Sequence, residues 1–483
     1  MSVPNRVNSR LRGYGFMLIP AILLSAQMFF LSCRGKVSVE KKQIILISID
    51  TLRADHISPA GYLRDTSPHL SQLVEDAVYY TQAYPNGCWT MPSHMSLLTG
   101  TLPSRHGIIQ DWQSMNRGEY PEMNETIHTV SEVLRSEGIF TIKSALLPEE
   151  LGFGKGYDIN RRGDPLEDEE RFKILLEDMA GIKDEDFFLF VHTWMVHAPY
   201  SNSRFLAENR LDPQGRARID KFRQSLPDGV DKVSLFREFL IEHDLYNRQD
   251  CMALYDSGIH YVDAMLGRLF RQIHELGIYD QMMLIVVSDH GEHFSEHYPR
   301  QFYDHHGRDF YEEFIKVPLI VKYPHSYRRG RREQPVALVD VVPTILDFYE
   351  IEIPDFVQGD SLLLPYRKRS RGYVVSEAIS VTGVERKMIR QGALKYIVTM
   401  PDPEGAARMN WKGINEKRLF DLKNDPQESI NLFPDLSFNK TCNSMERALL
   451  SEIRRSAESN TGMKKSKLSE ETLEHLKSLG YIK

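Results

Sequence analysis

The chain has 483 residues, a formal net charge of −7 and 41% hydrophobic residues. This length suits two or three domains, or one large α/β domain with an appendage. The composition is that of an ordinary globular protein with a sizeable core. Because the charge balance is mildly acidic, nothing in it indicates nucleic acid as a partner, and we expect none.

Residues 1–33 have the pattern of a secretory signal. A start with three arginines precedes an apolar run at residues 16–31, which is short for a membrane span. The letters FLSC that close this region resemble a bacterial lipoprotein processing site, although Phe30 stands where leucine is usual. We therefore expect acylation of Cys33 and a location in the bacterial cell envelope, outside the cytoplasm. An uncleaved anchor helix and plain secretion are the alternatives, and both also place the protein outside the cytoplasm.

After a polar tether at residues 34–42, apolar runs alternate with helix-like segments. The runs are IILISI, FFLFV, MLIVV and VPLIV. Continuous β-branched and aliphatic runs of this length favour strands that are buried on both faces of a parallel sheet. Between the second and third runs, apolar residues recur at helical spacing from Ile259 to Ile273, which predicts an amphipathic helix. This alternation predicts an α/β fold, with a central, mostly parallel sheet flanked by helices.

We expect a catalytic domain at residues 43–365 and a smaller C-terminal α+β subdomain with a helical tail at residues 366–483. Within the first, residues 201–250 are charged and irregular, which predicts a variable cap or loop beside the site. Within the second, short strands precede helical segments near 440–459 and 469–479.

Three cysteines remain besides the one in the signal region. Cys88, Cys251 and Cys442 lie far apart in the sequence. Their spacing matches neither a disulfide framework nor a metal site, so each is expected to be a buried free thiol.

Four polar residues stand where buried segments end or begin. Asp50 closes the run IILISID, and Asp289 and His290 close the run MLIVVSDH. Ligands gather at the carboxyl ends of strands in such sheets, so we expect these side chains to meet there. Thr90 lies two residues before Pro92, where the start of a helix favours an anion. Two carboxylates, an imidazole and a hydroxyl predict a metal-activated nucleophile.

The same residues carry a family resemblance. The run TMPSHMSLLTG at residues 90–100 resembles the signature of sulfatases, part of the alkaline phosphatase superfamily, in which nucleophile-x-Pro-x-Arg precedes Ser-x-x-Leu-Thr-Gly. The similarity continues in DTLRADH, VHTWMVHAPY, LYDSGIHYVDAMLGRL, SDHGEHFSEH and HHGRDFYEEFIKVPLIV, and reaches the final LKSLGYI. It covers residues 43–483 and implies an alkaline-phosphatase-like fold and an ester hydrolase.

The resemblance places Thr90 at the nucleophile position. Family sulfatases carry formylglycine there, made from cysteine or serine, and the secondary carbon of Thr90 cannot become that aldehyde. Cys88 does not substitute, because Pro92 follows it by four residues instead of two. We therefore expect no formylglycine and a direct attack by the Thr90 hydroxyl. The competing interpretation is that Thr90 only caps the helix.

The resemblance also implies one divalent cation, held by Asp50, Asp289, His290 and Thr90. His290 replaces an amide that is common in calcium-dependent sulfatases, and Thr51 stands where many relatives carry a second carboxylate. Fewer hard oxygen ligands and one imidazole shift the preference from Ca²⁺ towards Mn²⁺, Zn²⁺ or Mg²⁺.

Histidines complete the implied reaction site. His197 and His306 match family positions that contact the ester oxygens and protonate the leaving group. His94 replaces the arginine of the signature and is expected to hydrogen-bond near the nucleophile, with packing as the alternative. Met195 stands where many relatives carry an aspartate, which favours a one-metal site.

Further residues are candidates for holding the ligands in place from behind. These candidates are His192, Glu292, His297 and Arg53. For Arg53 a second interpretation is an ion pair with Asp55 that holds the end of the strand.

The sequence therefore predicts a sulfatase-family, metal-dependent hydrolase of sulfate or of phosphate and phosphonate esters. The expected substrate is a small-molecule, glycan or lipid ester, and the expected membrane contact is a lipid anchor. Two alternatives stay open. One is a transferase that passes the group on Thr90 to a lipid or glycan hydroxyl, and the other is a non-catalytic surface protein that keeps the fold for binding.

Overall fold

The computed structural model describes residues 41–483, with gaps at 110–119, 201, 209–212, 228–229, 298–308, 380–384, 401–415, 459–464 and 479–483. The signal region with Cys33 lies outside the described residues, and so does His306. None of the helices in the described part combines the length and the apolar character that crossing a membrane requires.

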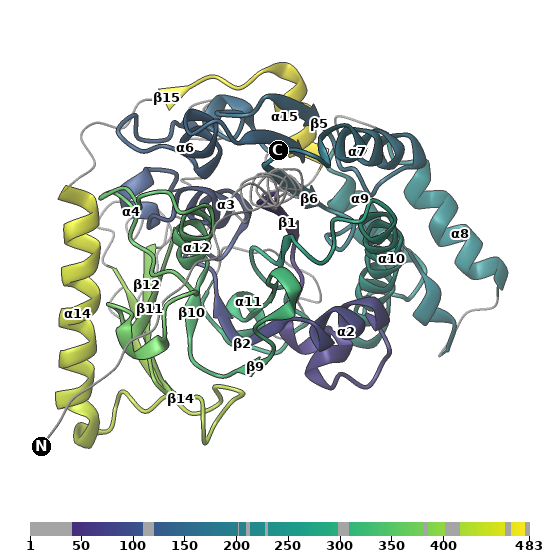
Figure 1. Ribbon diagram of the computed structural model, residues 1–483. Coiled ribbons are helices and arrows are strands. Elements are labelled where there is room, and N and C mark those ends of the chain that lie inside the picture. Colours follow the sequence, from purple (N-terminus) through teal and green to yellow (C-terminus); the bar gives the residue numbers. More distant parts are fainter. Residues whose placement is uncertain are drawn as a thin grey trace, which may run out of the picture. The chain divides into compact units, whose positions relative to one another are not determined.

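A nine-stranded sheet forms the centre of the described chain (Figure 1). Its strands follow the order β10–β2–β8–β7–β1–β6–β4–β5, and β9 pairs with β2. Strands β7, β1, β6, β4 and β5 are parallel neighbours, so the predicted mostly parallel sheet is confirmed. The strand bounds are β1 Gln43–Ile49, β2 Val78–Tyr84, β4 Phe140–Ala145, β5 Ile159–Arg162, β6 Phe187–Thr193, β7 Met283–Val287, β8 Val317–Lys322, β9 Gly330–Arg332 and β10 Val336–Ala337.

One strand runs against the prediction. The run VPLIV forms β8, which is antiparallel to both β7 and β2. The short helix α11, Glu312–Ile315, ends one residue before β8, and the amide of Gly291 just after β7 donates to the carbonyl of Phe314 in that helix, at 2.7 Å. The chain therefore enters β8 from the edge where β7 ends, and a parallel strand would need a long crossover instead.

Helices cover both faces of the sheet because successive strand residues point to opposite sides. In β1, Ile45, Ile47 and Ile49 pack into one hydrophobic cluster, and Ile44 and Leu46 pack into another. The first cluster includes helices α2 Pro68–Glu75, α7 Glu169–Ile182, α9 Lys232–Glu242 and α10 Arg248–Glu275, and the second includes α3 Thr90–Thr99, α6 Val130–Ser136 and α12 Val341–Tyr349. The amphipathic helix predicted around residues 259–273 is part of α10.

The sequence predicts an irregular segment at 201–250, but the described residues of this segment are largely helical. It contains η4 Arg204–Glu208, α8 Pro213–Gln224 and α9, and α10 begins within it. In α9 the side chains of Val233, Phe236 and Leu240 recur at helical spacing and are buried, and the Asp231 carboxylate accepts from the amide of Ser234 as an N-cap. The apolar stripe was hidden in the sequence by the many charges between its members. Its role as a cap beside the site stays a prediction.

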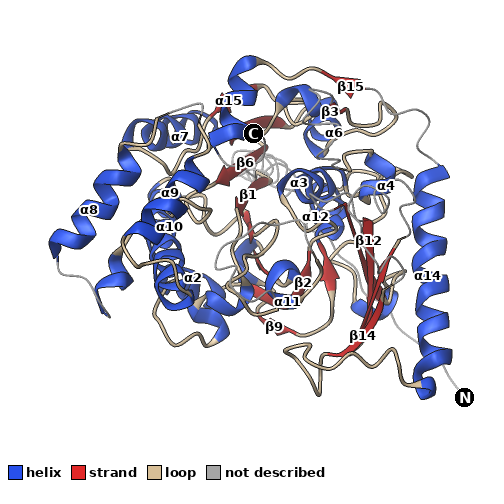
Figure 2. Cartoon of the chain, turned by 180° about the vertical axis from the view of Figure 1, so that it is seen from behind, coloured by secondary structure: helices blue, strands red, loops and turns tan. Residues whose placement is uncertain are grey.

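The C-terminal part contains a four-stranded antiparallel sheet in the order β11–β12–β13–β14, next to the long helix α14 (Figure 2). Leu449 of α14 packs with Ile389 and Leu419 of this sheet. The bounds are β11 Tyr373–Ile379, β12 Glu385–Gln391, β13 Leu394–Thr399, β14 Lys417–Asp421, α14 Asn439–Glu458 and α15 Glu470–Ser478. The two helices agree with the predicted positions, while the boundary at residue 365 stays a prediction.

Short elements connect these layers. The C-terminal strand β15 pairs with β3, so the tail returns to the first half of the chain. The short elements are β3 Tyr120–Pro121, β15 Lys465–Ser466, α4 Pro103–His106, η1 Ala54–His56, η2 Ser58–Ala60, η3 Glu149–Leu151, η5 Pro324–Ser326, η6 Leu338–Asp340, η7 Tyr366–Lys368 and η8 Leu436–Phe438. The cysteines Cys88, Cys251 and Cys442 are buried thiols, as predicted, and none forms a disulfide within the described residues.

The helical packing of residues 232–242 can be tested by truncation. Phe236 is fully buried, whereas Ile241 in the same helix is 55% exposed. We expect Phe236→Ala to lower the free energy of unfolding by about 3–5 kcal/mol, because it removes a buried aromatic ring and leaves a cavity. Ile241→Ala is the matched control and should cost less than about 1 kcal/mol. Urea unfolding curves measure both values, and equal effects would contradict the observed packing.

Candidate active site

Three neighbouring strands bring their carboxyl ends to one place. Ser48 of β1 pairs with His192 of β6 on one side and with Val287 of β7 on the other. Asp50 is the first residue after β1, and Asp289 is the second after β7. Both carboxylates therefore lie at the edge where ligands collect in parallel sheets, as predicted.

Helix α3 brings the hydroxyl of Thr90 to the same edge. Thr90 Oγ1 donates to Asp50 Oδ2 at 3.4 Å and lies 3.3 Å from His290 Nε2. Thr90 is the first residue inside α3, and the N-cap position belongs to Trp89. The hydroxyl thus contacts the carboxylate and the imidazole at the site, and the interpretation of Thr90 as a helix cap is wrong.

Asp50, Asp289 and His290 form a compact group of possible metal ligands. One ligand atom from each lies within 4.8 Å of the others. His290 Nε2 is 3.7 Å from Asp50 Oδ1 and 3.5 Å from Asp289 Oδ2. All three side chains are fully buried. The four residues that the sequence singled out are therefore brought together.

The carboxylates of Asp50 and Asp289 form no ion pair with a lysine or arginine of the described residues. Burial raises the pKa of Asp50 well above its usual range, and the nearby Asp289 carboxylate raises it further. Within the described residues, Asp50 Oδ1 and Asp289 Oδ2 accept no hydrogen bond, and no lysine or arginine pairs with either carboxylate. Buried oxygens without partners are costly, so this donor set fits a divalent cation.

Hydrogen bonds orient the ligand atoms. Asp289 Oδ1 accepts from the amides of Thr51, at 3.2 Å, and of His290, at 2.9 Å, which leaves Oδ2 facing the site. His290 Nδ1 donates to the carbonyl of Gly291 at 2.8 Å. Since Nδ1 carries the proton, Nε2 presents its lone pair to the carboxylates, as a metal ligand must.

Thr51 has a backbone conformation that is unusual for a β-branched residue, with φ of 57°. This conformation turns its amide towards Asp289. Strain of this kind persists only where the surroundings hold it, and it is concentrated at functional sites.

His94 supports the backbone and not the hydroxyl of Thr90. Its Nδ1 donates to the carbonyl of Thr90 at 2.9 Å and lies 3.3 Å from Asp289 Oδ2. Its Nε2 accepts from the hydroxyl of Ser48 at 2.9 Å. Burial lowers the pKa of His94, which keeps the ring neutral. His94 is thus placed as a positioning residue, and its part in the reaction stays a prediction.

The other predicted histidines lie in different surroundings. His192 Nε2 is 3.3 Å from Asp50 Oδ2, as expected of a residue that holds this ligand in place. His197 is buried, and its Nδ1 donates to the carbonyl of Ala198 at 2.5 Å. The ring of Trp194 lies edge-on to both, with centroids 4.9 Å from His192 and 5.7 Å from His197.

Arg53 forms the ion pair with Asp55 that was its second predicted role. Its guanidinium pairs with Asp55 at 2.8 Å and with Glu296 at 2.8 Å, so it holds the loop after β1. His297 Nδ1 contacts Glu313 Oε1 at 2.7 Å. Glu292 is buried, which raises its pKa to about 7, and its Oε1 accepts from the amide of His293. Within the described residues neither side chain hydrogen-bonds to Asp50, Asp289 or His290, although the charge of Glu292 raises the pKa of Asp50.

A second group of possible ligands lies nearby. His293, Glu296 and Glu313 bring one atom each within 4.8 Å of the others. Unlike the first group, its carboxylates already have positive partners, because Arg53 pairs with Glu296 and His297 contacts Glu313. The first group therefore has the greater need of a cation.

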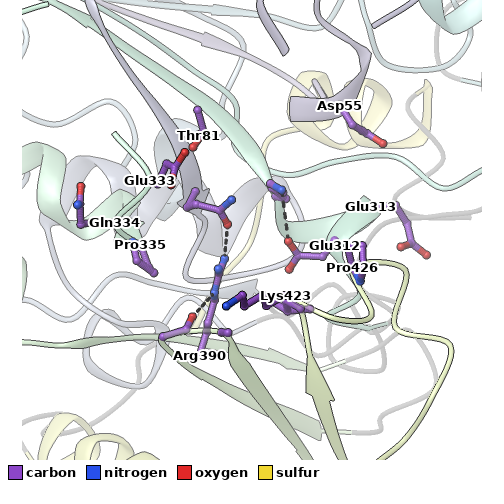
Figure 3. Close-up of a pocket in the computed structure, with 15 residues that line it drawn as sticks. Asp55, Thr81, Glu312, Glu313, Glu333, Gln334, Pro335, Arg390, Lys423 and Pro426 are labelled. Carbon is purple, nitrogen blue, oxygen red and sulfur yellow. Dashed lines mark hydrogen bonds and ion pairs between the residues drawn. The ribbon is translucent and has the colours of Figure 1, made fainter. Parts of the chain in front are cut away.

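A cavity of about 620 Å³ is lined by residues of this region and of the C-terminal sheet, and Figure 3 shows the side chains that line it. Asp55, which pairs with Arg53, and Glu313, which contacts His297, both line this cavity. Arg390 enters from β12 and donates to the side chain of Gln82 at 2.7 Å. The volume is in the range of small-molecule sites.

Several residues that organise the loops were missed. Tyr255 of α10 donates its hydroxyl proton to the carbonyl of Thr51 and accepts from the amide of Arg53. Asp164 accepts from the hydroxyl of Thr193 and from the amide of Trp194 after β6. The resemblance included the run with Tyr255, but nothing in it indicated this contact, which joins residues about 200 positions apart.

Comparison with known proteins identifies the family. The family model described as Sulfatase matches residues 42–351, which is more than half of the chain. The chain belongs to the sulfatase family. Mouse arylsulfatase K is 31% identical over 191 residues, which are 37% of this chain and 32% of the relative. The matched part thus spans about a third of that relative's length.

Solved structures of the family share the fold of this sulfatase-family chain. A structure in complex with its substrate D-glucosamine-2-N,6-O-disulfate has a TM-score of 0.63 and 18% identity, covering 86% of this chain and 98% of the other. The phosphonate monoester hydrolase of Silicibacter pomeroyi has a TM-score of 0.64 and 18% identity, covering 88% and 99%. The alkaline-phosphatase-like α/β fold is therefore confirmed.

Substitution of one ligand tests the metal group. We expect Asp289→Asn to weaken Mn²⁺ binding at least about a hundredfold, since a ligand matters no less than the residues that orient it. Calorimetric titration with Mn²⁺ measures the affinity. Without metal the variant should unfold at the same urea concentration or higher, because repulsion with Asp50 is gone.

Glu313→Gln in the second group is the matched control and should leave Mn²⁺ affinity within about threefold of the parent chain, because its carboxylate already has a partner. If Glu313→Gln removes binding and Asp289→Asn does not, the cation is held by the second group.

Proposed function

We propose that this sulfatase-family chain is a metal-dependent ester hydrolase in which Thr90 is the nucleophile. The observation that carries the proposal is the position of the Thr90 hydroxyl between Asp50 Oδ2 and His290 Nε2, at 3.4 and 3.3 Å. Thr90 is 2% exposed and Asp50 and His290 are fully buried, so water is largely excluded from this group.

Asp50, Asp289 and His290 would hold one cation, with Thr90 as a further ligand. When bound, a divalent cation would lower the pKa of the Thr90 hydroxyl and neutralise charge on the transferred group. Two carboxylates with one imidazole favour Mn²⁺, Zn²⁺ or Mg²⁺ over Ca²⁺, which prefers six to eight oxygen ligands.

In the first step, Thr90 Oγ1 forms a bond to the sulfur or phosphorus atom, and the bond from that atom to the ester oxygen breaks. The hydroxyl donates to Asp50 Oδ2, so this carboxylate is in place to take the proton. His197 would protonate the departing oxygen, together with His306, which lies outside the described residues. His94 holds the carbonyl of Thr90 and so fixes the direction of attack.

In the second step, water attacks the same sulfur or phosphorus atom and releases Thr90. One water proton goes to the Thr90 oxygen, and the remaining hydroxyl stays on the product, which is free sulfate, phosphate or phosphonate. Asp50 then releases its proton to solvent and His197 takes one up from solvent, which returns the chain to its starting state. This step needs no formylglycine, because water breaks the bond between Thr90 Oγ1 and the sulfur or phosphorus atom of the transferred group.

Sulfate esters and phosphate or phosphonate esters are both within the proposed range. The family's structural neighbours include one with a disulfated glucosamine as substrate and one named as a phosphonate monoester hydrolase. We further propose that the substrate is a glycan, lipid or small-molecule ester that is met outside the cytoplasm, where the lipid anchor at Cys33 would hold the chain.

Replacement of Thr90 tests the nucleophile. With aryl sulfate, aryl phosphate, phosphodiester and phosphonate substrates and added Mn²⁺, we expect Thr90→Ala to lose at least about a thousandfold in kcat/KM on the best substrate. Thr90→Ser keeps a hydroxyl at the same position and should retain much of the activity. Calorimetry should show that Thr90→Ala still binds Mn²⁺, because three ligands remain.

Mass spectrometry of the peptide with Thr90 should show an unmodified threonine at rest and an added sulfo or phospho group after rapid quenching. Full activity in Thr90→Ala would exclude the nucleophile. Release of a transfer product in place of free acid, when an alcohol acceptor is present, would favour the transferase.

A further inference from the structure

Two loops of this acidic chain are rich in basic residues and lie against each other. The first, at residues 327–332, reads YRRGRR, and the second, at 366–371, reads YRKRSR. The Arg328 guanidinium reaches across and donates to the carbonyls of Leu362 and Leu363, at 3.3 and 2.9 Å. Segments that are 35 residues apart in sequence are thereby joined, and their positive charges form one patch, which we name the arginine patch.

Most charges in the arginine patch have no carboxylate beside them. Among its eight basic residues, three pair with acids: Arg329 with Asp76, Arg369 with Asp340 and Arg371 with Glu452. The residues with no carboxylate within ion-pair distance in the described structure are Arg328, Arg331, Arg332, Arg367 and Lys368. Glu333 and Asp360 lie in or beside the two loops, and counting them as compensation still leaves an excess of positive charge.

The charges converge on a pocket. A cavity of about 470 Å³ is lined by Arg328, Arg332 and Arg369, together with Tyr80 and Tyr366. The same three guanidiniums act on the buried hydroxyl of Tyr80, where they oppose the rise of its pKa that burial causes. Like charges held this close repel each other, and a bound anion would offset this repulsion.

Exposed apolar side chains lie on the two loops or directly before them. Tyr327 is 57% exposed, Leu364 is 41% exposed and Tyr366 is 42% exposed. Tyr327 and Tyr366 each directly precede basic residues in the sequence, and the guanidinium of Arg369 lies 5.8 Å from the ring of Tyr366. Arginine mixed with tyrosine and leucine is typical of surfaces that lie in the boundary between lipid headgroups and acyl chains.

The arginine patch is separate from the catalytic residues. Strand β9 is the second half of the first loop and pairs with β2, and strands β8 and β7 stand between β2 and β1 in the sheet. A role for the patch is therefore independent of the reaction at Thr90.

We propose that the arginine patch binds the phosphate groups of an anionic phospholipid surface. The guanidiniums of Arg328 and Arg332 contact phosphate oxygens in the pocket, and Tyr327, Leu364 and Tyr366 enter the headgroup layer. A sulfated polysaccharide would also meet the charges, but it gives no reason for the exposed leucine and the two tyrosines. This attachment acts on the folded part of the chain and does not depend on acylation of Cys33.

A fluorescent label on the patch tests the proposal in the full chain. In the Cys33→Ser chain, Tyr366→Cys is labelled with a fluorophore whose emission rises in an apolar environment. Cys88, Cys251 and Cys442 are buried, so we expect them to stay unlabelled. The probes are vesicles of zwitterionic lipid and vesicles in which part of it is replaced by phosphatidylglycerol. We expect the emission to rise only with phosphatidylglycerol, and the rise to disappear at high salt.

The matched control carries the label at Leu436→Cys, which is 78% exposed and lies outside the patch, and its emission should not change. Arg328→Gln with Arg332→Gln should lower the vesicle affinity about tenfold or more. Arg367→Gln with Lys368→Gln removes two exposed charges without a described side-chain contact, so it tests the charges without a folding defect.

Three results would overturn the proposal. One is equal emission with both kinds of vesicle, and another is an equal rise at positions 366 and 436. The third is a change with soluble heparin but none with vesicles, which would assign the patch to an anionic glycan.

Discussion

The site depends on two carboxylates that are buried side by side. Asp50 and Asp289 are fully buried, and within the described residues no lysine or arginine offsets their charge. Desolvation raises the pKa of Asp50 and the nearby Asp289 carboxylate raises it further, and one oxygen of each carboxylate accepts no hydrogen bond from the part of the chain that the structure describes. A divalent cation would satisfy both oxygens at once, and the surrounding groups would form a frame for it.

That frame is built from backbone contacts. Asp289 is oriented by two amides, and one of them belongs to Thr51, which holds a strained conformation. The Tyr255 hydroxyl holds the chain on both sides of Leu52: it donates to the carbonyl of Thr51 and accepts from the amide of Arg53. These contacts fix the loop after β1 independently of the side chains that would face a substrate.

The two concentrations of charge in this chain are opposite in kind. At the strand ends, negative groups are buried and converge on a few atoms. In the arginine patch, positive groups are mostly exposed and spread over two loops that also present tyrosine and leucine. A buried group of acids suits one small ion, whereas an exposed basic surface suits an extended anionic partner.

The sequence alone determined the fold class, the family and the four residues at the centre of the site. These features follow from local order: apolar runs predict strands, and Asp50, Thr90, Asp289 and His290 stand directly at their ends or at a helix start. The tertiary structure decided what depends on distance through space. In the structure β8 is antiparallel to β7, and the charged segment before α10 forms packed helices. The Arg53 guanidinium forms ion pairs with Asp55 and Glu296. Contacts such as those of Tyr255 join residues far apart in the chain, and no local pattern carries them.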